Sequence, residues 1–556
     1  MCGIVGTNFK SNNFHHSIEL LEHRGPDNMG FCEYQNNQFG HTRLSIIDLD
    51  AEANQPMEFD NIIITFNGEI YNYQALIKEE DLTCKTSSDT EVLIRLYQKY
   101  GTDFLNKLNG MFSFCIYDKN KDIFFCARDR FGKKPFYYYF KDDKFIYASE
   151  IKSIVKILNT TPHFNRKALE EYLTFWTPIK NNTFYNDIKK LQGGYSLLLA
   201  AKNMEINKYY DIENIETKYF NEKETLNDIE ELLHNSISRR LVGNVEVASL
   251  LSGGIDSSFI SALYSKISTK KISTYCIGYD EHLHYSELSY AKKVSKYINS
   301  NHAEVIINKK EYLETINAML YHSDEPLGDS ACIPLYLLSK KISSDGYKVA
   351  LSGEGSDENF LGYDKYFSLL HSKEQYLTIN SAFNENEKTN LFKKYKKENY
   401  NFLKKYKSNL KQFTYVDMKI WTSELLMSKV DKMSMAHSVE IRTPFLDYHL
   451  VEYLLGVDEK IKQGDTNKYL LKQIAKKYLP AEIINRRKKG FSSPSIEWLY
   501  HEYKDDILYT ILRVNKKLNI FNEDFIKFIY NEAKEKRYKQ HLWNLYIFAR
   551  WFEKTY

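Results

Sequence analysis

The sequence lacks paired cysteines, and this excludes two common kinds of site. Its seven cysteines are scattered from Cys2 to Cys332, and no two of them form a CxxC pair. This spacing indicates neither a zinc site nor a disulfide framework. Six of them are typical of small buried apolar side chains, and Cys2 alone is distinguished by its position.

Long hydrophobic runs and an excess of one charge are also missing. No uninterrupted apolar stretch reaches the roughly 20 residues that a membrane-spanning helix needs. Residues 1–25 contain Asn, His, Arg and Glu where a signal peptide would have its apolar core. The formal net charge of +3 gives no reason to expect binding to nucleic acid or to a membrane surface. We therefore expect a cytoplasmic protein.

At roughly 100–200 residues per domain, a chain of 556 residues suggests several domains. Residues 2–206 read as an α+β unit, and residues 207–225 read as a polar linker. The patterns that predict elements in the first unit are the β-rich runs Ile62–Phe66, Phe112–Tyr117 and Ile123–Ala127 and the amphipathic helix Asp89–Tyr100.

Residues 226–556 have a different pattern, in which strands alternate with helices. Such alternation predicts βαβ units and a doubly wound parallel sheet, that is, an α/β fold. The expected elements are the strands Glu246–Leu251, Lys271–Gly278, His302–Ile307 and Tyr347–Leu351, a helix from Ser257 and a helix Ser286–Asn299. The last 190 residues or so have few strand signals and predict a largely helical C-terminal part.

A glycine-rich turn follows the first of these strands and opens a helix. A turn in this position predicts an anion site, because free backbone amides and the helix dipole face the ligand. The turn lacks the Lys of the GxxxxGK[ST] phosphate loop. Asp256 would repel a bare phosphate, so it indicates a bridging Mg²⁺. The turn consists of Ser252, Gly253, Gly254, Ile255, Asp256, Ser257 and Ser258.

A second turn, Leu351–Glu358, follows the last expected strand. Parallel strands end at the same edge of a sheet, where open α/β sheets bind their ligands. Both turns are therefore expected to face one nucleotide, with the carboxylates of Glu354 and Asp357 close to it.

The first unit offers a candidate nucleophile in Cys2. Methionine before a small residue is normally removed, which would leave Cys2 as the new terminus. Its own α-amine, with a pKa of about 7.7–8.0, can then act as the base for its thiol. The thiolate is the reactive form.

The other polar residues of this unit match the chemistry of glutamine hydrolysis. Arg43 can grip an α-carboxylate with two parallel hydrogen bonds, and Glu69 and Asp89 can neutralise an α-ammonium. The Asn67 side chain and the Gly68 amide can stabilise an oxyanion. Asn-Gly is also a strong hairpin signal, and a tight turn is compatible with this role.

These segments resemble a known family over nearly the whole chain. SGGIDSS at 252–258 resembles the PP-loop of ATP pyrophosphatases, and HRGPD at 23–27, TRLSI at 42–46, FNGEIYN at 66–72 and SSD at 87–89 resemble a class-II glutamine amidotransferase. The order of these two units, together with segments 429–436 and 440–447, is similar to glutamine-hydrolysing asparagine synthetases. The resemblance implies an N-terminal Ntn-hydrolase αββα sandwich followed by a PP-loop domain.

The resemblance also implies roles for single residues. Glu354 would influence formation of an acyl-adenylate, Lys468 would offset charge on the departing pyrophosphate, and Asp256 and Asp357 would hold Mg²⁺. Leu44 and Ile46 would join the glutamine site. The remaining ATP contacts implied are Leu251, Ser252, Gly253, Gly254, Ser257, Ser258, Ile277, Ser352 and Gly353.

Structural roles are expected for three further segments. Arg24 and Asp27 are interpreted as a buried pair that supports the glutamine site. Arg128-Asp129, Lys133–Pro135 and Ala148–Lys152 follow the family pattern and are expected where the two domains meet.

The function expected is ATP-dependent conversion of a carboxylate into an amide with nitrogen from glutamine. Aspartate is the leading acceptor, and a homodimer is a candidate state in the family. The acceptor stays open because 324–334 and 540–545 depart from the enterobacterial-type synthetases. A sugar or peptide carboxylate is therefore one alternative, and a non-catalytic paralogue that senses glutamine or nucleotide is another.

Overall fold

A computed structural model of the chain describes residues 2–213, 215–369, 381–398, 400, 406–488, 490, 493–533 and 537–556. Within these residues, the N-terminal half contains two antiparallel six-stranded sheets. One sheet has the order β10 (Ile188–Lys190), β8 (Tyr137–Lys141), β9 (Lys144–Ala148), β1 (Gly3–Thr7), β3 (Asn37–Arg43) and β2 (Asn28–Tyr34). The other has the order β12 (Asn203–Lys208), β11 (Tyr195–Ala200), β7 (Ile123–Arg128), β6 (Gly110–Asp118), β5 (Ile62–Ile70) and β4 (Met57–Phe59).

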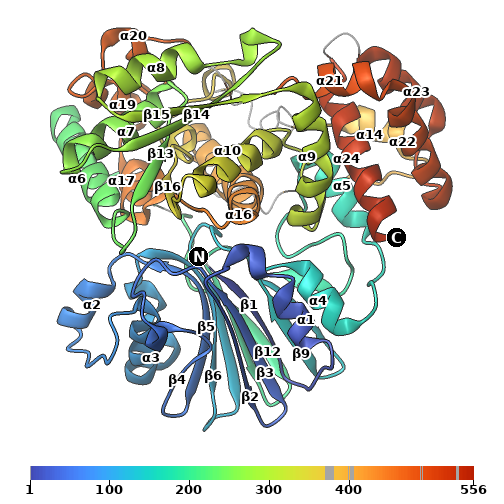
Figure 1. Cartoon of the computed structure of the whole chain (residues 1–556). Coiled ribbons are helices and arrows are strands. Elements are labelled where there is room, and N and C mark those ends of the chain that lie inside the picture. Colours follow the sequence, from blue (N-terminus) through green and yellow to red (C-terminus); the bar gives the residue numbers. More distant parts are fainter. Residues whose placement is uncertain are drawn as a thin grey trace.

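The two sheets pack face to face and helices cover their outer sides (Figure 1). Ile4 and Phe39 of one sheet share a buried cluster with Tyr117 and Phe124 of the other. The outer layers are α1 (Phe14–Glu19) and α4 (Ile151–Leu158) on one side, and α2 (Tyr73–Glu79) and α3 (Asp89–Tyr100) on the other. This arrangement confirms the αββα sandwich, and α3 has the bounds that the sequence predicts.

The C-terminal half is built on a parallel sheet. Its strands have the order β15 (Asn301–Ile307), β14 (Ser273–Tyr279), β13 (Val247–Leu250), β16 (Val349–Leu351) and β17 (Glu440–Arg442). Val247 and Val349 pack into one hydrophobic cluster, whereas Ala248 and Ala350 pack into another. The sheet is therefore covered on both faces, as a doubly wound α/β fold requires.

The strand β17 lies in a segment for which the sequence analysis expects no strand. Residues 429–435 do lie in α16 (Met427–Met435), but Glu440–Arg442 pair in parallel with β16. A strand of three residues is too short to show the alternation of apolar and polar residues from which strands are predicted. The strand geometry of β17 is set by the edge of β16 rather than by local propensity.

Helices make up most of the remaining described chain, as expected. They are α5 (Arg166–Phe175), α6 (Glu222–Arg239), α7 (Ile255–Ile267), α8 (Leu288–Tyr297), α9 (Lys309–Ser323), α10 (Cys332–Ser344), α11 (Ser356–Asn359), α12 (Lys365–Ser368), α14 (Glu385–Leu391), α15 (Asn409–Val416), α17 (Tyr448–Gly456), α18 (Glu459–Gln463), α19 (Tyr469–Ala475), α20 (Ala481–Ile484), α21 (Ser495–Glu502), α22 (Lys504–Leu518), α23 (Glu523–Glu532) and α24 (Lys539–Thr555). A π-helical segment, Asp417–Leu426, leads into α16. Within the described ranges, no helix has the length and apolar character needed to span a bilayer.

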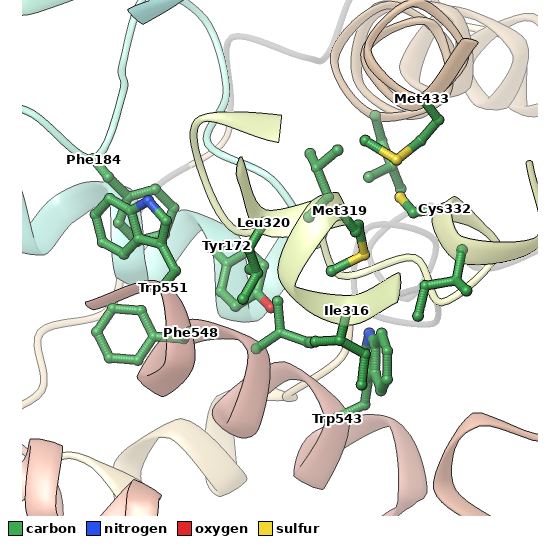
Figure 2. Close-up of a cluster of buried hydrophobic side chains, with 14 of the residues drawn as sticks. Tyr172, Phe184, Ile316, Met319, Leu320, Cys332, Met433, Trp543, Phe548 and Trp551 are labelled. Atoms are coloured by element: carbon green, nitrogen blue, oxygen red, sulfur yellow. The ribbon is translucent and has the colours of Figure 1, made fainter. Parts of the chain in front are cut away.

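The last helix is anchored in a core that includes residues from the first 200. Figure 2 shows Phe548 and Trp551 of α24 close to Phe184, and Trp543 of the same helix beside Ile316 of α9. The Phe184 and Trp551 rings lie 4.9 Å apart, and the Tyr172 hydroxyl donates to the Asn544 carbonyl oxygen over 3.1 Å. The two halves of the chain are thus joined through α24.

Buried ion pairs join the two halves closer to Cys2. The Arg24 guanidinium, which is 0% exposed, donates to Glu150 over 3.0 Å and to Asp431 of α16 over 2.8 Å. Lys134 Nζ lies 3.2 Å from Asp431 Oδ1, and Lys133 Nζ donates to the Leu446 carbonyl oxygen. The expectation that 133–135 and 148–152 lie between the domains is confirmed.

The expected pair of Arg24 with Asp27 is wrong. Asp27 is exposed and its carboxylate pairs with Lys348 over 2.7 Å. Arg24 points away from Asp27 because two carboxylates from later segments, Glu150 and Asp431, surround its guanidinium. A partner so distant in sequence has no local signal.

We predict that Asp431→Asn destabilises the protein by about 3–5 kcal/mol, because it leaves buried cations without their full countercharge. Burial works to raise the pKa of Asp431, yet Arg24 and Lys134 together hold it below its usual range. Chemical unfolding at neutral pH measures the change. Asp27→Asn, which breaks the exposed pair with Lys348, is the control and should cost less than about 1 kcal/mol. Equal losses in both variants would contradict this prediction.

Candidate active sites

Cys2 lies at the start of β1, directly beside a side-chain amide. It is 7% exposed, and its backbone nitrogen donates to Asn67 Oδ1 over 3.1 Å. Arg24 Nε donates to the Cys2 carbonyl oxygen, also over 3.1 Å. Burial raises the pKa of the Cys2 thiol, while the Leu44 backbone amide opposes this shift. The main chain of Cys2 is therefore held on both sides by side chains.

The amide of Asn67 is oriented by this contact. Its Oδ1 accepts the hydrogen bond from the Cys2 backbone nitrogen, and its buried Nδ2 has no hydrogen-bond partner among the described residues. An unpaired buried donor carries a cost unless a ligand satisfies it. Asn67 Nδ2 is therefore available to an oxyanion formed next to Cys2.

Gly68 lies in the interior of β5 opposite Phe112, so the hairpin interpretation of Asn67-Gly68 is wrong. A Cβ atom on Gly68 would lie 2.1 Å from the Met111 carbonyl oxygen. Glycine is needed here because the neighbouring strand approaches closely, and not because the chain turns.

Two buried carboxylates face the same region. Asp89 begins α3, and its Oδ2 accepts from the Ile70 amide over 2.9 Å. Burial raises the pKa of Asp89 to about 7. Burial also raises the pKa of Glu69, and the negative charges of Glu440 and Asp89 add to this rise. Arg442 opposes it, since its Nη2 lies 3.7 Å from Glu69 Oε2. Such a site favours a ligand that brings positive charge.

Arg43, Leu44 and Ile46 are buried nearby. The guanidinium of Arg43 is held by the following loop: Nη1 donates to the Asp50 carbonyl oxygen over 2.8 Å and to Asn54 Oδ1 over 2.7 Å. Its Nη2 donates to the Asp48 carbonyl oxygen. Binding of a substrate carboxylate by Arg43 therefore stays a prediction.

The second site is a cavity of about 590 Å³ at the carboxyl ends of β13 and β16. This volume is in the range of about 300–1,000 Å³ typical of ligand pockets. The predicted ATP residues that line it are Leu251, Ser252, Gly254, Asp256, Ser257, Ile277, Ser352 and Gly353. Gly253 and Ser258 belong to the same turn but do not line the cavity; Gly253 has a φ of +76°, and Ser258 is buried in α7.

Lys468 joins the two glycine-rich turns across the cavity. Its Nζ lies 2.5 Å from Asp256 Oδ2 and 2.6 Å from Asp357 Oδ1. Lys488 Nζ lies 2.7 Å from the same Asp357 oxygen. The sequence analysis selected Lys468 from a Lys-rich chain, and the structure brings it between the two carboxylates.

The same geometry bears on Mg²⁺. Two carboxylates that converge on one point suit Mg²⁺, which proteins bind through one or two carboxylates together with phosphate oxygens. No cluster of three or more His, Cys, Asp or Glu side chains suited to a metal occurs within the described part of the chain. Asp256 and Asp357 therefore fit the ion only together with a phosphorylated ligand.

The sequence analysis missed several charged groups of these sites. Arg442 reaches Glu69 from β17, and Lys429 of α16 lines the cavity together with Asp329 and Glu354. Lys429 and Arg442 lie in segments that were quoted for their family pattern, but no local spacing assigns them to a site. Pairing of distant segments brings them there.

One chain thus carries a buried thiol beside an oriented amide and, separately, a cavity lined by charged residues of both signs at the ends of parallel strands. These two centres define an ATP-dependent amidotransferase of two domains. A family model described as "Glutamine amidotransferase domain" matches residues 1–210, and one described as "Asparagine synthase" matches residues 228–553. The chain belongs to the glutamine-hydrolysing asparagine synthetase family, whose members are ligases.

Relatives extend over most of the chain. Asparagine synthetase [glutamine-hydrolyzing] 1 of Bacillus subtilis is 30% identical, covering 96% of this chain and 92% of the relative. Asparagine synthetase B of Escherichia coli is 29% identical, with 85% and 77% covered. Amidase chyE of Penicillium rubens is 27% identical, with 87% and 85% covered. Relatives with different names therefore share both domains.

We predict that Asp89 makes the stability of the free protein depend on pH. Its pKa of about 7 in the fold lies above the roughly 3.9 of an unfolded chain. Between these values the native state binds more protons, so the contribution of Asp89 is full below about pH 4 and is lost as the pH rises through about 7.

Asp89→Asn keeps an acceptor for the Ile70 amide and cannot titrate. Urea unfolding from about pH 5 to 8 should show the wild type losing stability relative to Asp89→Asn. The exposed Asp103→Asn is the control and should follow the wild type. A constant difference between wild type and Asp89→Asn across this range would contradict the assignment.

Proposed function

We propose that this protein is a cytoplasmic enzyme that converts L-aspartate into L-asparagine with ATP and with ammonia from glutamine. The products are glutamate, AMP and pyrophosphate. The observation that carries the proposal is Asn67 Nδ2, a buried donor with no partner among the described residues, which lies beside the cysteine that removal of Met1 would make terminal. The nucleotide cavity with its two facing turns supports the second half of the reaction.

In the glutaminase site, the Cys2 α-amine takes the thiol proton and Cys2 Sγ attacks the side-chain amide of glutamine. Asn67 Nδ2 and the Gly68 amide stabilise the oxyanion, each donor contributing roughly 2.7–4 kcal/mol in comparable sites. The thioester forms as ammonia leaves, and water then releases glutamate. Asp89 and Glu69 receive the α-ammonium of glutamine, and Arg43 its α-carboxylate.

In the synthetase site, the acceptor carboxylate attacks the α-phosphorus of ATP, and pyrophosphate departs. The turn 252–258 and Ser352-Gly353 bind the phosphates through their amides. Asp256 and Asp357 would hold Mg²⁺, which when bound offsets phosphate charge. Lys468 offsets charge on the leaving pyrophosphate, and Glu354 lies beside the carboxylate to be activated. Ammonia then attacks the acyl-adenylate to give the amide and AMP.

We predict that Cys2→Ala abolishes glutamine-dependent synthesis and leaves ammonia-dependent synthesis within about twofold of the wild type, because Cys2 acts only in glutamine hydrolysis. Mass analysis of the product formed from ATP, aspartate and either nitrogen donor measures both rates. Cys84→Ala, at a half-buried cysteine away from both sites, is the control and should keep both activities. ADP in place of AMP, or loss of both activities in Cys2→Ala, would overturn the proposal.

We predict that Asp256→Asn lowers synthesis at least ~100-fold with glutamine and with ammonia alike, since it removes charge stabilisation from the adenylation step. Pyrophosphate release is the measurement. Glutamine hydrolysis should persist, which shows that the variant is folded. Asp280→Asn, an exposed residue just after β14, should retain both activities. Normal pyrophosphate release by Asp256→Asn would rule out the role given to this carboxylate.

A further inference from the structure

One wall of the nucleotide cavity carries an ion pair that the reaction described above does not use. Lys429 Nζ lies 2.9 Å from Asp329 Oδ2, and the two side chains are 5% and 17% exposed. Both residues line the cavity. A charged pair that lines a cavity, largely withdrawn from solvent, is costly to maintain unless further partners complete it.

The two residues come from separate elements that meet at the cavity. Lys429 lies on α16, and Val430 of α16 and Leu426 just before it also line the cavity. Asp329 precedes α10, and its Oδ1 accepts from the Ala331 amide over 2.9 Å. The two charges thus come from separate segments, and the apolar side chains of Leu335 and Val430 line the same cavity.

Glu354 relates this pair to the phosphate-binding turns. Burial raises the pKa of Glu354. The positive charge of Lys429 opposes this rise, and the negative charges of Asp329, Asp357 and Asp256 add to it. Glu354 therefore shares one cavity with the ion pair and with Asp256 and Asp357 of the two glycine-rich turns. An acceptor whose reacting carboxylate sits near Glu354 can reach Lys429 and Asp329 with its other end.

We propose that Asp329 and Lys429 form the acceptor subsite and bind the α-ammonium and the α-carboxylate of a free α-amino acid. This inference rests on the proposed function and specifies its acceptor class. A zwitterion offers each member of the pair an opposite charge, so one ion pair is replaced by a network of charge-assisted hydrogen bonds. A sugar acid offers no ammonium to Asp329, and a carboxylate at the end of a peptide has no adjacent free ammonium.

Asp329 also has a structural contact, and the test has to separate the two roles. Asp329→Asn keeps an acceptor for the Ala331 amide and removes the charge that would pair with an ammonium. Asp345→Asn is the matched control, because Asp345 forms an ion pair with Lys341 over 2.7 Å at the other end of α10, outside the cavity.

The experiment measures the KM for L-aspartate and the inhibition constant of succinate, which has the same two carboxylates without the ammonium. Pyrophosphate release with ammonia as nitrogen source is the assay. For Asp329→Asn we expect the aspartate KM to rise about 10- to 100-fold, as for loss of a hydrogen bond between charged groups. The succinate inhibition constant, the KM for ATP and glutamine hydrolysis should stay within about twofold of the wild type.

The outcomes separate the two proposals. If the wild type forms no AMP with aspartate, the proposed function fails whatever the variants do. If the wild type does form it, and the aspartate KM of Asp329→Asn is unchanged, the subsite is wrong. It is also wrong if the ATP KM rises in parallel or if succinate inhibition changes as much as aspartate binding. Asp345→Asn should match the wild type in every measurement.

Discussion

The buried charges between the two domains are the constraint on which the rest of the molecule depends. Arg24 has no exposed surface, and its guanidinium meets Glu150, Asp431 and the carbonyl oxygen of Cys2. Charges withdrawn from water in this way tolerate little displacement, since each must keep its partners. The start of β1 is therefore held in register with α16, and the thiol is placed relative to the other domain.

Arg442, in a strand of the second domain's sheet, contacts both candidate sites. The Ser352 amide donates to the Arg442 carbonyl oxygen over 2.9 Å, while the Arg442 side chain faces Glu69. One residue of β17 thus contacts the second glycine-rich turn through its main chain and the buried carboxylate of Glu69 through its side chain. Both centres share a rigid boundary, and neither is positioned by loops alone.

Much of the fold and of both candidate sites is predictable from the sequence, and the predictions that are wrong have physical causes. Both glycine-rich turns, α3 and the β-rich runs have local signals: strand, turn and helix follow one another within a few residues. Asn67-Gly68 has a local signal for a hairpin that the pairing of β5 with β6 overrides. The strand β17 pairs with a segment about 90 residues earlier, and the partners of Arg24 lie 126 and 407 residues away, so no local window of sequence contains them.

The packing of α24 has a consequence for how the chain is handled. Tyr172 and Phe184 lie within the residues that match the glutamine amidotransferase model, yet they share one hydrophobic core with Trp543, Phe548 and Trp551 (Figure 2). A glutaminase fragment that ends near residue 206 would carry half of that core uncovered, as would a chain shortened by its last helix. Exposed apolar surface promotes aggregation. Either fragment expressed alone is therefore expected to be poorly soluble, whatever its catalytic residues.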